Sequence, residues 1–200
     1  MHHHITLPNK HNKNKNDERS AKMDENEVLD RFIKSGVLKG IWFKEVPVGL
    51  EVLTKIALRE RKSWEEFEPD KVINIYSVGT KSIDAVCITD FQNLIKPSIK
   101  LGDWIKIYMD VSLNPFKGRS VWLIEAKSAL MSESAFTAIG QLLYYEHHFK
   151  KDWKGIIQGK AIVYGCETDE VTLDAIKGLK TPLGIVAWHV SRDGKVTCVS

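Results

Sequence analysis

Apolar residues recur along this chain with two periods, which alternate from segment to segment. Positions that repeat every three or four residues predict helices, whereas short β-branched and aromatic runs predict strands. Helices are expected at residues 24–34, 51–61, 134–150 and 169–179, and strands at 72–78, 82–89, 121–127, 160–165, 184–190 and 195–199. Strands interleaved with helices are typical of a mixed β-sheet flanked by helices, so we expect an α/β fold.

Three local features qualify this pattern. Pro47 is expected to break an extended segment at residues 41–48, because proline has no N–H to offer a β-ladder. Residues 91–119 are ambiguous and are expected to form a short helix followed by a strand around 104–109. Gly140 lies inside the 134–150 helix, where glycine costs about 1 kcal/mol relative to alanine. We therefore expect Gly140 to serve close packing of this helix on the sheet.

The strand predicted at 121–127 carries an acid and an amine near its end. Side chains alternate across a strand, so Glu125 and Lys127 project to one face. Gln141 and Tyr145 stand one turn apart on the following helix and also point together. The acid-x-Lys pattern occurs four times in the chain, but only here does it end an apolar run. An acid and an amine beside a polar helix stripe could hold a metal ion and a phosphate, which indicates phosphodiester cleavage.

A further acid is expected on a neighbouring strand. Asp84 is centred in the apolar run 82–88, and a carboxylate is costly to bury unless it is paired or binds a metal. A divalent cation shared with Glu125 would account for it. Asp110 is the alternative, since it also follows an apolar run and is nearer to Glu125 in sequence. We favour Asp84, because it lies within its run rather than at the end.

Taken together, Asp84, Glu125-x-Lys127 and Gln141-x-x-x-Tyr145 resemble the motifs of the PD-(D/E)xK nuclease superfamily. The Gln-x-x-x-Tyr helix motif is similar to that of its RecB-type branch. The resemblance covers residues 73–190 and implies a restriction-endonuclease-like fold, a mixed β-sheet flanked by helices. The long gap between Asp84 and Glu125 then requires an insertion around residues 91–119.

The resemblance also implies a set of metal ligands. Asp84 and Glu125 would bind one or two Mg²⁺ ions, for which Mn²⁺ could substitute, and the backbone carbonyl of Ala126 would be a further ligand. Members of the superfamily often add an acid from the first helix. Both Glu27 and Glu60 qualify by sequence, and the choice between them stays open.

The remaining motif residues would act on the attacking water and the substrate. The resemblance implies that Lys127 orients this water or offsets charge at the phosphate. Gln141 and Tyr145 would position Lys127, a metal-bound water or the nucleic-acid backbone. We therefore expect a Mg²⁺-dependent deoxyribonuclease, with RNA not excluded as a substrate. The alternative is a nuclease-fold module that binds nucleic acid or a protein without cutting.

Charge and composition fit this hypothesis without requiring it. The 200 residues include 43% hydrophobic residues, enough for one domain over residues 23–200. Residues 1–22 look disordered and carry the whole net charge of +3. Local basic clusters at 117–119 and 150–154 are then expected to flank the site. Three widely spaced cysteines, no apolar signal segment and no run of transmembrane length lead us to expect a cytoplasmic protein without a membrane partner. A homodimer stays open.

Overall fold

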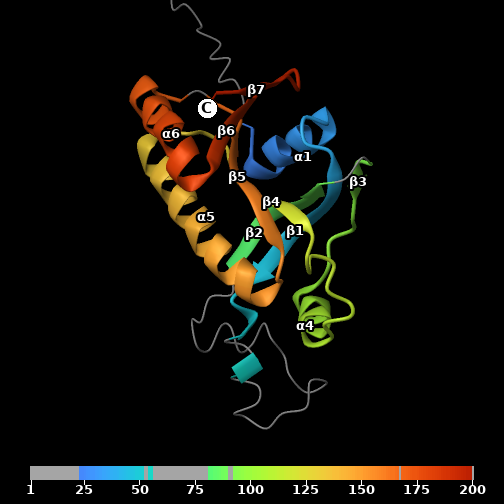
Figure 1. The fold of residues 1–200 in the computed structure, drawn as a ribbon. Coiled ribbons are helices and arrows are strands. Elements are labelled where there is room, and N and C mark those ends of the chain that lie inside the picture. Colours follow the sequence, from blue (N-terminus) through green and yellow to red (C-terminus); the bar gives the residue numbers. More distant parts are fainter. Residues whose placement is uncertain (1–22, 52–53, 56–80, 90–91, 167, 200) are drawn as a thin grey trace, which may run out of the picture.

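The computed structural model describes residues 23–51, 54–55, 81–89, 92–166 and 168–199. Its helices are α1 (Glu25–Ser35), α4 (Leu101–Met109), α5 (Ser132–Asp152) and α6 (Glu170–Leu183). Its strands are β1 (Gly40–Val48), β2 (Lys81–Thr89), β3 (Leu94–Ile95), β4 (Ser120–Lys127), β5 (Ile156–Tyr164), β6 (Ile185–Val190) and β7 (Val196–Cys198). They form one seven-stranded sheet in the order β3-β1-β2-β4-β5-β6-β7 (Figure 1).

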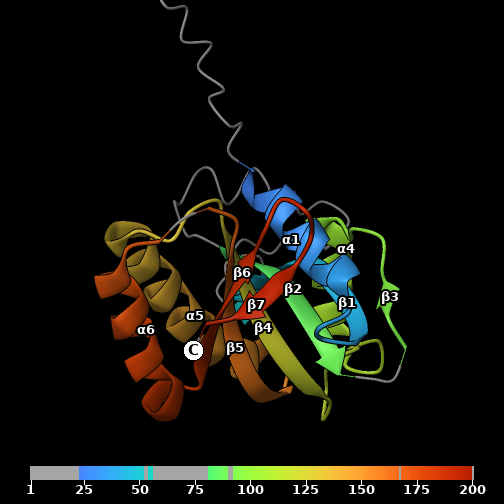
Figure 2. The ribbon, with the colours of Figure 1, turned by 90° about the horizontal axis from the view of Figure 1, so that it is seen from above.

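The sheet is mixed, and helices cover both of its faces. The pairs β4–β5 and β5–β6 are parallel, whereas β1–β2, β2–β4 and β6–β7 are antiparallel. Helix α1 packs on one face, and α5 and α6 pack on the other (Figure 2). The apolar stripe of α1 consists of Val28, Leu29, Phe32 and Ile33. The predicted α/β architecture is confirmed.

Most predicted elements recur in the structure with shifted ends. Helices at 24–34, 134–150 and 169–179 and strands at 82–89, 121–127, 184–190 and 195–199 are present, and β5 begins earlier than predicted. The strand predicted around 104–109 is wrong, because these residues belong to α4. Trp104 and Ile105 are buried and Tyr108 is half-buried, a spacing that places them on one helical face. The strand predicted at 72–78 and most of the 51–61 helix lie outside the described residues.

Two local expectations are corrected. Strand β1 runs through Pro47, which pairs with Ser82. On the other edge of β1, strand β3 pairs only with Ile41 and Trp42. Within the described residues, no strand lies beside Pro47 on that edge, so its missing N–H leaves no hydrogen bond unmade there. Gly140 does not pack against the sheet: it is exposed, and a Cβ there would meet nothing within 4 Å. None of the described helices is long and apolar enough to cross a bilayer.

Gly40, at the start of β1, is expected to tolerate no side chain. A Cβ at this position would lie 2.1 Å from the backbone oxygen of Ile88 and 2.6 Å from the sulfur of Cys87. Backbone atoms within a sheet cannot yield cheaply, so Gly40→Ala should lower the free energy of unfolding by about 1–3 kcal/mol. Urea denaturation measures this change. Gly178→Ala is the matched control, since Gly178 faces open space in α6 and alanine should stabilise that helix. Equal effects of the two substitutions would contradict the close approach of β1 and β2.

Candidate functional site

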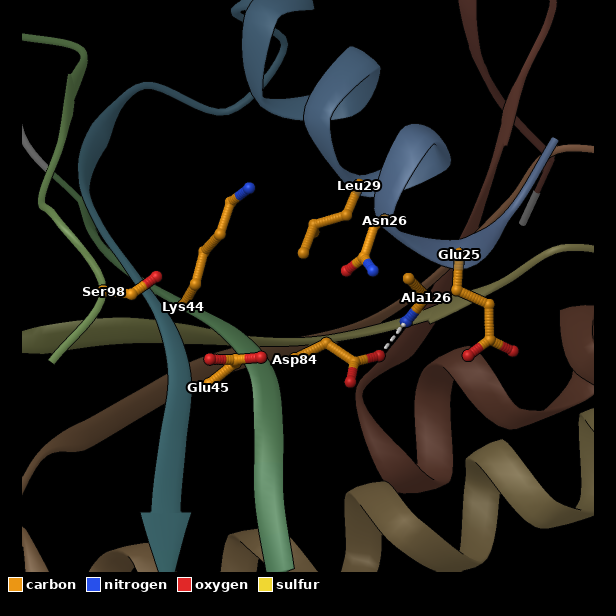
Figure 3. Close-up of a pocket in the computed structure, with 8 residues that line it drawn as sticks. All are labelled: Glu25, Asn26, Leu29, Lys44, Glu45, Asp84, Ser98 and Ala126. Atoms are coloured by element: carbon orange, nitrogen blue, oxygen red, sulfur yellow. Dashed lines mark hydrogen bonds between the residues drawn. The ribbon is translucent and has the colours of Figure 1, made fainter. Parts of the chain in front are cut away.

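Strands β2 and β4 part at the position where Asp84 lies. Their antiparallel pairing ends at Ala85 and Ile124. One step further on, the Ala126 N–H donates to the carboxylate of Asp84 instead of to a backbone carbonyl, with 2.7 Å between nitrogen and Oδ2 (Figure 3). A side-chain hydrogen bond thus takes the place of a backbone hydrogen bond between β2 and β4. It holds the Asp84 carboxylate in the opening between the two strands.

Glu125 and Lys127 project to one face of β4, as the strand period predicts. Lys127 Nζ donates to Glu125 Oε1 at 2.6 Å. The Glu125 side chain is only 1% exposed, and its second oxygen, Oε2, is buried without a hydrogen-bond partner. A buried carboxylate oxygen normally has a donor or a cation beside it. This oxygen therefore marks a place where the site can accept a further positive group.

The two carboxylates share a poorly solvated space. Burial and the charge of Asp84 together raise the pKa of Glu125 to about 7, against the hydrogen bond from Lys127, which lowers it. Burial also raises the pKa of Asp84, against the Ala126 N–H and the charge of Lys127. A buried and a half-buried acid with one adjacent amine are short of positive charge when both acids are ionised.

Helix α5 brings Gln141 and Tyr145 to the same place. Tyr145 lies on the core-facing side of α5 and is 2% exposed. Gln141 Nε2 donates to Tyr145 Oη at 3.2 Å, whereas Gln141 Oε1 is buried without a partner. Burial raises the pKa of Tyr145, and the charges of Glu125 and Asp84 add to the rise, so this hydroxyl keeps its proton. The structure thus gathers Asp84, Glu125, Lys127, Gln141 and Tyr145, which are far apart in the sequence.

An acid that sequence reasoning missed completes the group. Glu25, in the first turn of α1, has Oε1 3.9 Å from Lys127 Nζ. Glu27, which the sequence offered instead, pairs with Arg31 at 2.7 Å, and Glu60 lies outside the described residues. The helical period contains the missing signal: Glu25 stands one turn before Leu29, on the stripe of α1 that faces the sheet, whereas Glu27 does not.

Asp110, the alternative to Asp84, lies elsewhere. It follows the end of α4, is exposed, and accepts hydrogen bonds from the backbone N–H and the hydroxyl of Ser112. These bonds lower the pKa of Asp110. Asp110 therefore behaves as a turn residue that stabilises its own loop.

The basic clusters do not flank the site, so that expectation is wrong. Gly118 N–H donates to the carbonyl of Lys154, and Ile156 N–H donates to that of Arg119, which joins both clusters at the start of β4. Glu125 lies near the other end of this strand. At about 3.3 Å per residue, the separation is roughly 20 Å. Helix α5 has to return the chain to the start of the parallel strand β5, so its basic end is carried away from the site.

Two cavities open on either side of Glu25. One, of about 260 Å³, lies below α1 and is lined by Asp84, Ala126 and Lys44 among others (Figure 3). The other, of about 450 Å³, is lined by Lys127 and by the first turns of α5. Glu45, which lines the first cavity, has a backbone φ of 53°, a left-handed conformation that residues other than glycine rarely adopt. A ligand can thus reach Asp84 from the first cavity, Lys127 from the second and Glu25 from both, whereas Glu125 lies behind them and lines neither.

The donor set fits a hard divalent cation. Within the described residues, no three His, Cys, Asp or Glu side chains gather closely enough to form a metal site. Mg²⁺ does not require three, since it is commonly held by one or two carboxylates together with waters and substrate phosphates. Asp84 and the unpartnered oxygen of Glu125 offer such a pair. No protein-family model, curated protein or solved structure matches the chain.

Proposed function

We propose that the protein is a Mg²⁺-dependent nuclease of the PD-(D/E)xK type, with a restriction-endonuclease-like fold, that hydrolyses phosphodiester bonds of DNA. One observation carries the proposal. The half-buried Asp84 and the buried Glu125 lie where two strands part, with an unpartnered carboxylate oxygen on Glu125 and with Lys127 beside it. Acid, acid and amine are the groups needed to hold a divalent cation and a phosphate together.

The charges around the site favour a metal-dependent reaction. Glu25 and Glu125 lie beside the amine of Lys127, and Asp84 interacts with its charge. Lys44, which lines the Asp84 cavity, is already paired with Asp30, so the ionised site carries more negative than positive charge. A phosphodiester would be repelled from such a site unless a cation lay between it and the carboxylates. A phosphate site without metal would instead be expected to be rich in arginine and lysine.

Each residue has a distinct role in this proposal. Asp84 and Glu125 would hold Mg²⁺, with the Ala126 carbonyl as a further ligand. Bound there, the ion supplies a Lewis acid for the phosphate and lowers the pKa of a water. Lys127 lies between Glu125 and Glu25, at 2.6 and 3.9 Å, which fixes its ammonium for orienting the attacking water. Tyr145, held by Gln141, lines the α5 side of the Glu125 carboxylate as a neutral hydroxyl.

Lys127→Met should slow cleavage by about a hundredfold or more while the protein stays folded. Methionine keeps the apolar stem but removes the ammonium, and loss of one positioned charge at a reacting phosphate costs about a hundredfold or more in rate. The assay uses labelled single-stranded, duplex and branched DNA, with an RNA control, in Mg²⁺, Mn²⁺ or EDTA. Lys106→Met is the matched control, because Lys106 is an exposed lysine of α4 that pairs with Asp103.

Two results would contradict the proposal. Cleavage by Lys127→Met at the rate of the wild type would remove Lys127 from the chemistry. No cleavage of any substrate by the wild type, together with nucleic-acid binding that EDTA leaves unchanged, would favour a binding module that does not cut.

A further inference from the structure

The outward face of α5 carries three exposed apolar side chains among polar ones, and nothing in the described part of the chain covers them. The helix packs on the sheet through residues such as Leu142, Tyr145 and Phe149. On its other side, Phe136 is 72% exposed and Leu143 and Tyr144 are each 40% exposed. The outer face of a helix on a soluble protein is usually polar. An exposed apolar stripe of this kind is typical of a protein–protein interface.

Gly140 lies in the middle of this stripe and is not required by the fold of the chain itself. A Cβ at this position would meet nothing within 4 Å. Glycine in a helix interior costs about 1 kcal/mol relative to alanine. Its absent side chain does, however, let a second backbone approach closely. The position therefore suits a crossing point with another helix.

Residues at equal distances before and after Gly140 form complementary pairs. Phe136 lies four residues before it and Tyr144 four residues after it, while Glu133 lies seven before and His147 seven after. In an antiparallel pair of α5 helices that cross at Gly140, Phe136 faces Tyr144 of the partner subunit. Glu133 then faces His147 of the partner subunit. A carboxylate then faces an imidazole, whose N–H can donate to it, and each contact occurs twice, as a two-fold axis requires.

We propose that the chain forms an antiparallel homodimer through the outward faces of α5, with the two-fold axis at Gly140. The same pairing gives the distant basic cluster a role, a step that rests on the proposed nuclease function. Lys151 lies near the end of α5, and in an antiparallel pair this end meets the start of α5 in the partner subunit. The start of α5, through Glu133, Ser134 and Thr137, lines the cavity that contains Lys127. Each subunit would thus bring its basic end to the site of the other and supply the positive charge for nucleic acid.

The mass in solution tests the dimer without any assay of cleavage. Gel filtration coupled to light scattering should give a molar mass twice the 22.8 kDa of one chain. Gly140→Arg should give a monomer, since a long charged side chain at the crossing point keeps the helices apart. Gly178→Arg, at an equally open glycine of α6, should stay dimeric. The measurement is made at up to about 100 μM protein, a concentration at which even a weak dimer would form. A wild type that is still monomeric there, or a Gly140→Arg protein that is dimeric, would overturn the proposal.

Cross-linking tests the position of the axis. Residue 140 must lie next to its own copy, within the roughly 7 Å between Cα atoms that a disulfide can span. Gly140→Cys, with Cys166 and Cys198 replaced by serine, should therefore form a covalent dimer under mild oxidation. Gly178→Cys in the same background should not. A dimer by mass in which Gly140→Cys fails to cross-link would place the interface elsewhere.

Mixed subunits test the shared site. Asp84→Asn removes a site carboxylate, and Lys151→Glu with Lys154→Glu reverses the basic end, so each protein alone should be nearly inactive. Random mixing makes half of the dimers mixed, and each mixed dimer has one complete composite site. The mixture should regain about a quarter of wild-type activity. If the wild type is an active nuclease and a dimer but the mixture recovers no activity, the shared site is refuted while the dimer stands.

Discussion

Asp84→Asn is expected to reduce Mg²⁺-dependent cleavage by at least about a hundredfold without weakening the fold. The substitution removes one of the two carboxylates that the proposal assigns to the cation, and removal of a direct ligand or a positioned charge costs on this scale. Asparagine keeps an oxygen that can accept from Ala126 N–H, so the opening between β2 and β4 should be preserved. Steady-state cleavage of the best DNA substrate measures the effect.

The Asp84→Asn protein is also expected to be more stable than the wild type. Burial raises the pKa of Asp84, so its ionised form is disfavoured in the folded protein at pH 8. Its charge also raises the pKa of Glu125. The neutral amide removes both costs, and Asp84→Asn should gain about 1 kcal/mol in free energy of unfolding at pH 8 without metal. Loss of activity together with a gain in stability is typical of a residue kept for function.

Asp110→Asn is the matched control. Asp110 is exposed and its pKa is lowered by its bonds to Ser112, so its ionised form is favoured in the folded protein. The substitution should therefore leave cleavage unchanged and should not raise stability at pH 8. Cleavage that survives Asp84→Asn but not Asp110→Asn would move the metal site to Asp110 and refute the assignment made from the geometry.

Sequence periodicity was sufficient for the parts of the site that depend on local structure. Glu125 and Lys127 share a face because a strand alternates, and Tyr145 joins Gln141 because a helix brings positions four apart together. The same rule would have selected Glu25 over Glu27, had the apolar stripe of α1 been followed back by one turn. Local periods place side chains on faces, and the faces then meet when the layers pack.

Features that depend on tertiary structure could not be predicted from those periods. The opening at Asp84 arises because β2 and β4 stop pairing, which no local pattern of either strand encodes. Residues 104–109 are apolar enough for a strand, and only packing of Trp104 against Phe43 and Phe116 shows why a helix is formed. The position of the basic clusters follows from the direction of α5 between two parallel strands, which becomes evident once β4 and β5 are known to be neighbours.

Mg²⁺ should stabilise the folded protein strongly at pH 8 and hardly at all at pH 5. Burial and Asp84 raise the pKa of Glu125 from 4.5 to about 7. Over that range the folded protein binds the proton more tightly than the unfolded chain, so stability without metal falls as pH rises, by about 3 kcal/mol in total. Above pH 7 the Glu125 carboxylate is ionised and can bind a cation, whereas at pH 5 a proton competes with the cation for it.

Thermal unfolding at constant ionic strength measures this dependence. A concentration of Mg²⁺ a hundredfold above its Kd contributes about 2.7 kcal/mol, which for a domain of this size raises Tm by roughly 5–10 °C. Glu125→Gln provides the comparison, since the amide neither titrates nor binds the ion well. Its Tm should respond to Mg²⁺ at neither pH, and its stability should decline less between pH 5 and 8 than that of the wild type. An equal rise in Tm with Mg²⁺ at pH 5 and pH 8 would show that the cation binds away from Asp84 and Glu125, because carboxylates with ordinary pKa values are already largely ionised at pH 5. An unchanged rise in Tm in Glu125→Gln would lead to the same conclusion.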